Sequence, residues 1–309
     1  MRIVYFVSTG FGLPSLERLG ADGHQIVGVV TTPDRARGRG RRVEQSPVAA
    51  FARQAGINPV LAPEALDDPG LVQSLAALKP DLFVVIAYRI LPASVFAVPP
   101  AGTVNLHASL LPRYRGAAPI QRAIENGERQ TGVTVFRIDA GVDTGGILVQ
   151  RSAAVGDTET APELSERLSR LGAEAMAEAV RGLADGTLRA RAQEEAGASR
   201  APKLRKEEGR MEWALPAKRL FDRIRAFKPF PSTYTFVDNR RLGVEWAEVI
   251  GSSGSAVPGT VELTGEGGIT VRCGEGSLLV TRVRPEGRSC MEAGAYLRGT
   301  PLRAGVRLG

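Results

Sequence analysis

Short apolar runs rich in β-branched residues alternate with amphipathic stretches through the first ninety residues, and this alternation constrains the fold more than any other feature. The runs are RIVYFV at 2–7, QIVGVVTT at 25–32 and DLFVVIA at 81–87, and the stretches between them include LPSLERLG at 13–20 and PVAAFARQAG at 47–56. Strands that are apolar along their whole length are covered on both faces, as in a parallel sheet wrapped by helices. The sequence therefore predicts an α/β fold with a Rossmann-like, mostly parallel sheet flanked by helices.

The rest of the chain changes rhythm and predicts a second, smaller domain. Residues 161–186 repeat apolar side chains at helical spacing, whereas residues 187–215 are polar and contain the loop formers Gly, Ser and Pro. Beyond a short helix come five short strands separated by turns, a pattern typical of a small, OB-like β-barrel: TYTFV, LGVEWAEVI, GTVEL, GITVRC and SLLVTRV. A chain of 309 residues is long enough for two cores. We expect a first domain at 1–186, a linker at 187–215 and a barrel at 216–309.

Composition limits where such a protein works. With 43% hydrophobic and 24% charged residues, the chain has no apolar run near the roughly 18 residues that a membrane span needs. The N-terminal segment MRIVYFVSTG has the pattern of a first strand rather than of a signal peptide. Cys273 and Cys290 are the only cysteines, too few for a disulfide framework or a cysteine zinc site. We expect a cytoplasmic protein that neither enters a membrane nor carries a metal.

The charge is positive and unevenly placed. The formal net charge is +7, and residues 201–309 hold 18 basic and 12 acidic side chains. Of the 40 basic residues 35 are Arg, whose planar guanidinium binds phosphate in a bidentate way. A polyanionic partner is one explanation; genome composition or thermal adaptation explains the total charge equally well.

The segment NLHASLLPRYRGAAPIQ at 105–121 contains one of the two histidines and is the first candidate site. In an extended strand Asn105, His107 and Ser109 point to the same face, and ligands of open α/β sheets bind beyond strand ends. A lone histidine near a strand end is more often structural, but a second segment, DAGVDTGG at 139–146, adds Asp139 and Asp143 in a glycine-rich loop.

Together an asparagine, a histidine and an aspartate suit acyl transfer. The asparagine amide donates to a developing oxyanion, and the aspartate fixes the imidazole tautomer. Apart from Ser109 no nucleophile accompanies them. This absence favours direct attack of an amine on an acyl donor, which must then be a cofactor.

The run from Asn105 to Leu148, NLHASLLPRYRGAAPIQRAIENGERQTGVTVFRIDAGVDTGGIL, resembles the signature of the folate-dependent formyltransferases. Their catalytic Asn, His and Asp match Asn105, His107 and Asp143. Three further segments resemble the family members that act on methionyl initiator tRNA: TTPDRARGRGRRVEQSP at 31–47, KLRKEEGRMEW at 203–213 and IRAFKPFPSTYT at 224–235. The resemblance implies 10-formyltetrahydrofolate as the formyl donor, the α-amino group of methionine on the tRNA as the acceptor, and a C-terminal barrel that helps to hold the tRNA.

The same resemblance implies the roles of further residues. Asn105 and His107 would stabilise charge on the formyl oxygen, while Asp143 would orient His107 and assist proton removal, directly or through water. Ser109 would support its loop rather than react. The expected folate-binding residues lie in three loops: Ala87, Tyr88, Arg89, Ile90 and Leu91; Ser109, Leu110, Leu111 and Pro112; and Asp139, Ala140, Gly141 and Val142.

Two basic segments are the expected tRNA contacts. Five arginines fall within eight residues after the second strand and would repel one another without an anionic partner, although a solvated loop is the plain alternative. The stretch 203–228 carries nine basic and four acidic residues, and its plain alternative is an exposed linker and helix. The candidate residues are Arg35, Arg37, Arg39, Arg41 and Arg42 in the first segment, and Lys203, Arg205 and Lys206 in the second.

Three rival hypotheses remain at this stage. A formyltransferase acting on a glycinamide nucleotide or an amino sugar nucleotide would use the same three residues, but the basic segments speak against it. A nucleic-acid-binding protein without catalytic activity is the second rival, but it would not need Asn105, His107 and Asp143. The Asp143-Thr144-Gly145 triplet also matches aspartic proteases, which require two such carboxylates, and the chain has one such set. We expect a monomer that binds a folate and an initiator tRNA.

Overall fold

The computed structural model describes residues 1–33, 35–37, 42–44, 47–251 and 256–309, with the backbone alone at 35–37 and 42–44. The chain forms two compact units, which are considered separately below. Unit 1 comprises 1–119, 130–154 and 165–201, and unit 2 comprises 120–129, 155–164 and 202–309. The sequence suggested contiguous domains, whereas unit 2 takes in two short segments from the first half of the chain. Among the described residues, no helix is both long and apolar enough to cross a bilayer.

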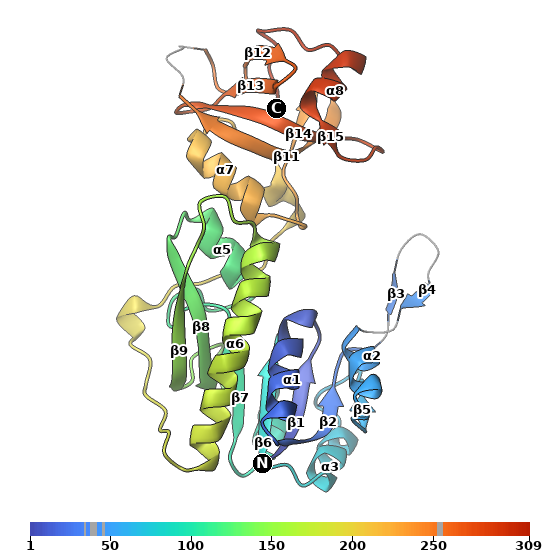
Figure 1. Cartoon of the computed structure of the whole chain (residues 1–309), viewed down its shortest axis with the longest axis vertical. Coiled ribbons are helices and arrows are strands. Elements are labelled where there is room, and N and C mark those ends of the chain that lie inside the picture. The colour runs from blue at the N-terminus through green and yellow to red at the C-terminus, as the bar shows by residue number, and fades with distance from the viewer. Residues whose placement is uncertain (34, 38–41, 45–46, 252–255) are drawn as a thin grey trace. The chain divides into compact units, whose positions relative to one another are not determined.

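Unit 1 is built on a seven-stranded sheet, seen in Figure 1, whose order is β5-β2-β1-β6-β7-β8-β9. The first five strands run parallel, and β8 and β9 add an antiparallel edge. This confirms the mostly parallel sheet. The bounds are β1 (Arg2–Val7), β2 (Gln25–Val30), β5 (Val60–Leu61), β6 (Leu82–Ile86), β7 (Thr103–His107), β8 (Gln130–Arg137) and β9 (Ile147–Ala154).

Helices cover both faces of this sheet because its central strands are apolar on both sides. On one face Phe6 of β1 and Phe83 of β6 pack with their ring centroids 5.1 Å apart, in a cluster with Leu75 of α3 and Val95 of α4. On the other face α6 approaches so closely that a Cβ at Gly172 would lie 2.5 Å from Leu106. The helical bounds are α1 (Leu13–Ala21), α2 (Pro47–Gln54), α3 (Pro69–Ala77), α4 (Ala93–Phe96), α5 (Pro119–Glu125) and α6 (Ala161–Ala184), with a 3₁₀ turn at Gly10–Gly12.

The arginine-rich segment after β2 contains two short strands rather than the loop predicted from its sequence. β3 (Arg35–Arg37) and β4 (Arg42–Glu44) pair antiparallel, with Ala36 opposite Val43. Backbone pairing at both ends of the segment therefore overrides its glycine-rich composition. The remaining candidates of this segment, Arg39 and Arg41, lie outside the described residues.

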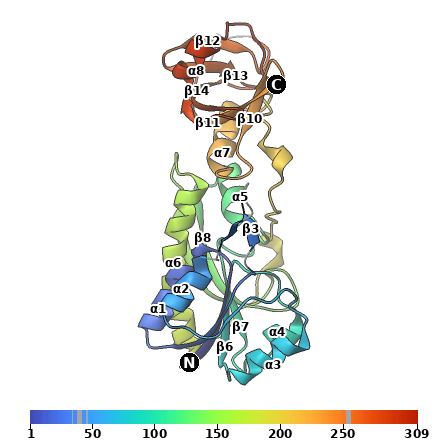
Figure 2. The same ribbon diagram turned by 90° about the vertical axis from the view of Figure 1, so that its right-hand side faces the viewer.

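Unit 2 is a curled antiparallel sheet closed against helix α7, as Figure 2 shows. Its order is β10-β11-β14-β13-β12, and β15 pairs with β14. Register shifts near Trp246 interrupt the long pairing of β11 with β14, as bulges do where strands bend. The five predicted strands are all present, and the OB-like barrel is confirmed. The bounds are α7 (Ala217–Ala226), β10 (Tyr234–Val237), β11 (Arg240–Ile250), β12 (Val261–Gly265), β13 (Gly268–Arg272), β14 (Ser277–Pro285), β15 (Met291–Glu292) and α8 (Ala293–Gly299).

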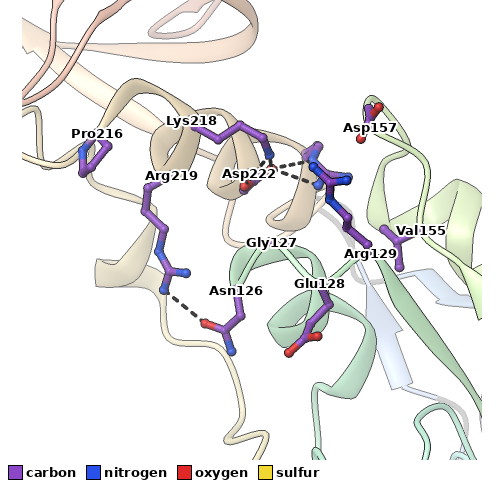
Figure 3. Close-up of a pocket in the computed structure, with 11 residues that line it drawn as sticks. Asn126, Gly127, Glu128, Arg129, Val155, Asp157, Pro216, Lys218, Arg219 and Asp222 are labelled. Atoms are coloured by element: carbon purple, nitrogen blue, oxygen red, sulfur yellow. Dashed lines mark hydrogen bonds and ion pairs between the residues drawn. The ribbon is translucent and has the colours of Figure 1, made fainter.

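A buried charge cluster explains why unit 2 includes segments from the first half of the chain. Asp222 of α7 accepts hydrogen bonds from Lys218 at 2.5 and 2.7 Å and from Arg225 at 2.8 and 2.9 Å. Arg225 in turn donates to the backbone oxygens of Gly156 and Glu159, both at 2.9 Å. Lys218, Asp222 and Arg225 line a pocket of about 360 Å³ together with residues 126–129, as Figure 3 shows. The polar face of α7 thus binds chain segments from before the predicted linker.

Candidate functional site

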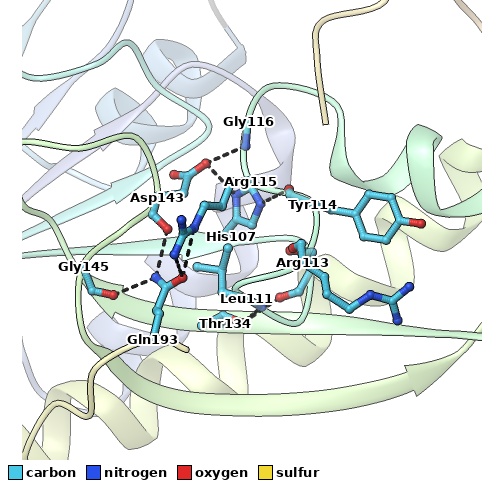
Figure 4. Close-up of polar contacts among 11 residues, drawn as sticks. His107, Leu111, Arg113, Tyr114, Arg115, Gly116, Thr134, Asp143, Gly145 and Gln193 are labelled. Atoms are coloured by element: carbon cyan, nitrogen blue, oxygen red, sulfur yellow. Dashed lines mark hydrogen bonds and ion pairs between the residues drawn. The ribbon is translucent and has the colours of Figure 1, made fainter. Parts of the chain in front are cut away.

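His107, the last residue of β7, faces Asp143 from the loop between β8 and β9 (Figure 4). His107 Nδ1 lies 3.6 Å from Asp143 Oδ2, and the two side chains are 7% and 13% exposed. The other ring nitrogen, Nε2, lies 2.8 Å from the backbone oxygen of Tyr114. The structure therefore brings together two of the three predicted catalytic residues in a largely buried setting.

The surroundings of the His107 ring indicate where its protons lie. A carbonyl oxygen only accepts, so Nε2 carries a proton and donates it to Tyr114. Nδ1 faces a carboxylate, which attracts it when it also carries a proton. Nε2 is therefore the donating ring nitrogen, and Nδ1 is the nitrogen that faces the Asp143 carboxylate.

Asp143 reaches His107 because its loop folds back along β7. Arg137, the last residue of the antiparallel strand β8, pairs with Val104, so the loop starts about 10 Å from His107 along the strand. Asp143 adopts a left-handed backbone conformation with φ of +56°, and Gly116 N–H donates to its Oδ2 at 2.8 Å. The loop also packs tightly against the end of β8. A Cβ added at Gly145 would lie 1.7 Å from the Arg137 backbone oxygen, so there is no room for a side chain there.

Asn105, the third predicted catalytic residue, lies two positions before His107 on β7 and is partly buried. Its side-chain oxygen Oδ1 is fully shielded and has no hydrogen-bond partner among the described residues. Such an orphaned acceptor costs about 1–3 kcal/mol unless something donates to it. The Asn105 oxygen is therefore an acceptor that no described residue satisfies.

The predicted folate residues after β7 are tied into the protein itself. The Ser109 hydroxyl donates to the Arg113 oxygen at 2.6 Å, which matches the supporting role expected for it. Leu111 is buried, and its backbone bonds to the side chains of Thr134 and Gln150. Leu110 and Pro112 are partly buried beside them. These contacts fix the backbone that follows the histidine.

The predicted folate residues after β6 point in different directions. Leu91 is 5% exposed and belongs to the core cluster on the sheet, whereas Ile90 is 77% exposed. Arg89 donates to the backbone oxygens of residues 63 and 64 at 2.6 and 2.8 Å and lies over the Tyr88 ring. Burial raises the pKa of the Tyr88 hydroxyl, which donates to the Thr31 oxygen at 3.2 Å. Ala87 is exposed and has a positive φ of 49°.

The predicted residues 139–142 form the exposed part of the Asp143 loop. Asp139 Oδ1 accepts from Gly141 N–H at 2.9 Å and from the Thr144 hydroxyl at 2.7 Å, which closes a tight turn. Ala140 and Gly141 are exposed, and Val142 is 51% exposed. An apolar side chain held in water at the rim of a site offers contact area to a ligand.

The second set of predicted tRNA residues is accessible. Lys203, Arg205 and Lys206 are all exposed, at the start of the segment that leads into α7. Three other basic residues of 203–228 do not extend this surface. Arg223 and Arg225 are buried in ion pairs, and Lys228 is half-buried over Trp246, where burial lowers the pKa of its amine. Charge counted along the sequence therefore overstates the charge available to a partner.

The sequence analysis missed three residues of the site, two of them within the predicted linker. Gln193 donates to the backbone oxygens of Asp143 and Gly145, and Ser199 Oγ accepts from Tyr114 N–H at 2.9 Å. Arg115 bonds Gln193 and Glu195, and its hydrogen bond lowers the pKa of the Glu195 carboxyl. The alternation LRARAQ at 188–193 was the available signal, since it is the pattern of an edge strand and Arg191 bridges to Ile147.

In the ranges that the structure describes, no three His, Cys, Asp or Glu side chains gather as metal ligands would.

Comparison with known proteins assigns the class. A model of the formyl transferase family matches residues 1–180, which include Asn105, His107 and Asp143, and a model of the formyl transferase C-terminal domain matches residues 203–301. The chain therefore belongs to the formyl transferase family.

Individual relatives narrow this assignment. A methionyl-tRNA formyltransferase from Geobacter metallireducens is 41% identical over 310 residues, covering 100% of this chain and 99% of its own length. Another from Caldanaerobacter subterraneus is 42% identical and covers 100% of both chains. Among solved structures, HypX from Aquifex aeolicus in complex with tetrahydrofolic acid superposes with a TM-score of 0.65 at 18% identity, over 96% of this chain and 47% of that one. HypX supports the fold, and the two relatives place the chain among the methionyl-tRNA formyltransferases.

Proposed function

We propose that the protein transfers the formyl group of 10-formyltetrahydrofolate to the α-amino group of methionine on initiator tRNA, for the start of translation. The observation that carries the proposal is the joint presence of His107 against Asp143 and the orphaned acceptor on Asn105, in a chain whose relatives bear this activity. We also propose that it acts as a monomer in the cytoplasm.

The three side chains divide the chemistry of an acyl transfer between them. Attack of an amine on a formyl group places negative charge on the formyl oxygen and positive charge on the amine. The His107 imidazole and the Asn105 amide group are suited to hold the negative oxygen. The Asn105 Oδ1 atom, which lacks a donor, is suited to accept an amine N–H and so to orient the attack.

Proton removal falls to the pair of His107 and Asp143. Asp143 is a carboxylate with one backbone N–H donor, and it lies next to the imidazole, so a proton can pass to it directly or through a water. No covalent intermediate on the protein is needed, because the amine attacks the formyl carbon of the donor directly. The bond between the formyl carbon and the folate nitrogen would break as the new formamide bond forms, and the leaving nitrogen would take up the proton removed from the acceptor amine, which releases tetrahydrofolate.

The loops around the three residues are the proposed folate site. The segments 87–91, 109–112 and 139–142 all flank β7 or its neighbours, and their exposed members are the ones that can touch a ligand directly. These are Ala87, Ile90, Asp139, Ala140, Gly141 and Val142. The members that bond or pack within the protein, such as Arg89, Leu91 and Ser109, would hold the backbone of those loops in place.

The proposed tRNA contacts are the exposed Lys203, Arg205 and Lys206 together with the arginines between residues 35 and 42. Phosphate neutralisation makes binding depend on salt. Replacing the three residues of the second set by Ala is expected to weaken tRNA binding and to reduce the slope of log affinity against log salt by up to about 0.9 for each lost contact. An unchanged slope would move the contact to another surface.

The catalytic roles are tested by separating transfer from binding. His107→Ala and Asp143→Asn are each expected to lower the rate of formyl transfer by about 10²- to 10⁴-fold, while tRNA affinity, measured by filter binding, stays nearly unchanged. Asp185→Asn, the same change at an exposed turn, is the matched control and should retain full activity. A loss of tRNA affinity as large as the loss of rate would contradict the roles assigned to His107 and Asp143.

A further inference from the structure

The Gln193 side chain stands at the centre of the polar network beside Asp143 (Figure 4). Its Nε2 donates to the backbone oxygen of Asp143 at 2.9 Å and to that of Gly145 at 2.8 Å. Its Oε1 accepts two hydrogen bonds from Arg115, at 2.8 and 3.1 Å. A primary amide has two N–H donors and an oxygen with two lone pairs, so every bonding position of this group is used.

The neighbours of this amide dictate its orientation. A guanidinium only donates, so the Gln193 oxygen must face Arg115. The two backbone carbonyls only accept, so the nitrogen must face Asp143 and Gly145. The backbone of the segment is also fixed, since Arg191 and Ile147 exchange hydrogen bonds of 2.7 and 2.9 Å. Gln193 is therefore a preorganised clamp on the loop rather than an adaptable surface group.

The Gln193 clamp restrains a stretch of backbone at Asp143 whose conformation is unfavourable on its own. A φ of +56° at Asp143 is unfavourable for a residue with a Cβ, by about 1–2 kcal/mol. The two bonds from Gln193 fall on either side of Thr144 and restrain the peptide groups that set the direction of the Asp143 side chain. The carboxylate is then held 3.6 Å from His107 Nδ1, where a small displacement of the loop would carry it away.

We propose that Gln193 is a positioning residue for formyl transfer, which fixes the Asp143 carboxylate against His107 from a segment outside the sheet. This inference rests on the proposed function, because it assigns Gln193 a role in that reaction. Gln193 touches neither reacting atom and acts through Asp143 alone. Because a misplacement of about 1 Å costs on the order of 10²-fold in rate, losing the clamp should lower kcat by about 10- to 100-fold.

The test is a double-variant cycle with Gln193→Met and Asp143→Asn. Methionine keeps the length of the side chain but donates nothing. Alone, Gln193→Met is expected to lower kcat by about 10- to 100-fold with KM for methionyl-tRNA within about threefold of wild type. Combined with Asp143→Asn, it is expected to add less than about twofold to the loss that Asp143→Asn causes by itself, because the clamp then positions nothing reactive.

Two controls protect the interpretation. Gln73→Met makes the same change on the exposed face of α3 and should leave kcat unchanged. Gln193→Glu retains the Arg115 contact but turns a carboxylate toward two carbonyl oxygens. It should therefore behave as Gln193→Met does, and it replaces that variant if Gln193→Met does not fold. Thermal unfolding of each variant checks folding.

Multiplicative losses in the double variant would overturn the proposal, since they would show that Gln193 acts independently of Asp143. Unchanged kcat in both Gln193 variants would overturn it equally. Failure of the proposed function looks different: the wild-type protein would then not formylate methionyl-tRNA. In that case the same cycle, measured with whichever amine the wild type does formylate, still decides the role of Gln193.

Discussion

The buried ion pair of α7 allows a stability prediction of definite size. Arg225 and Asp222 are 3% and 4% exposed, and Arg225→Met removes two bonds to the carboxylate and two to backbone oxygens. Breaking a buried pair by deleting one partner costs about 3–5 kcal/mol. Lys218 remains bonded to the carboxylate, so we expect a loss near the lower end, about 3 kcal/mol. Such a loss is a large part of the 5–15 kcal/mol that typically stabilises a domain.

Urea denaturation measures this loss selectively. Both tryptophans of the chain, Trp213 and Trp246, lie in unit 2, so their fluorescence follows the unfolding of the unit that contains Arg225. Lys218→Met is the matched control. It removes a cation from the same carboxylate, but the Lys218 side chain is 57% exposed, so the expected cost is below about 1 kcal/mol. A cost for Arg225→Met no larger than that of the control would refute the reasoning from burial.

Two further predictions concern backbone strain and thiol ionisation. Gly116→Ala should lower both the stability, by about 1–3 kcal/mol, and kcat, because Gly116 has φ of +119° and an added Cβ would lie 2.8 Å from the Ala201 oxygen. Thermal unfolding and transfer assays test this, and an unchanged kcat would contradict it. Burial raises the pKa of the Cys273 thiol to about 12, above the value of about 8.5 in the unfolded chain. The unfolded state alone then loses this proton between those values, so stability should fall by about 1.4 kcal/mol per pH unit as pH rises through that window. Cys273→Ala should make the fall less steep in urea titrations at pH 8.5 and 10, and equal slopes in the two proteins would refute this assignment.

The sequence predicted the central architecture because the relevant signals are local. Continuous apolar runs predict strands buried on both faces, and the spacing of Asn105 and His107 follows from the period of a strand. These features depend on neighbours a few residues away. The parallel sheet and the barrel both appear in the structure, whereas the pairing of Asp143 with His107 was expected only from the family resemblance.

Contacts between distant segments were harder to predict. Gln193 is fifty positions from Asp143, and although the alternation at 188–193 indicates an edge strand, it does not indicate that this strand runs against the β8–β9 loop. The burial of Arg225 was not predicted, because two of its partners, the backbone oxygens of residues 156 and 159, lie far from it in sequence. The return of the Asp143 loop along β7 likewise depends on the antiparallel direction of β8, which an apolar strand pattern does not specify.

The measurement that tests the central claim most directly is formyl transfer from 10-formyltetrahydrofolate by the wild-type protein to three acceptors assayed side by side. These are methionyl initiator tRNA, a glycinamide nucleotide and an amino sugar nucleotide. The account predicts rapid formylation of the tRNA and none of either small amine. Transfer to a small amine alone would leave Asn105, His107 and Asp143 in their roles but would contradict the assignment of initiator tRNA as the substrate.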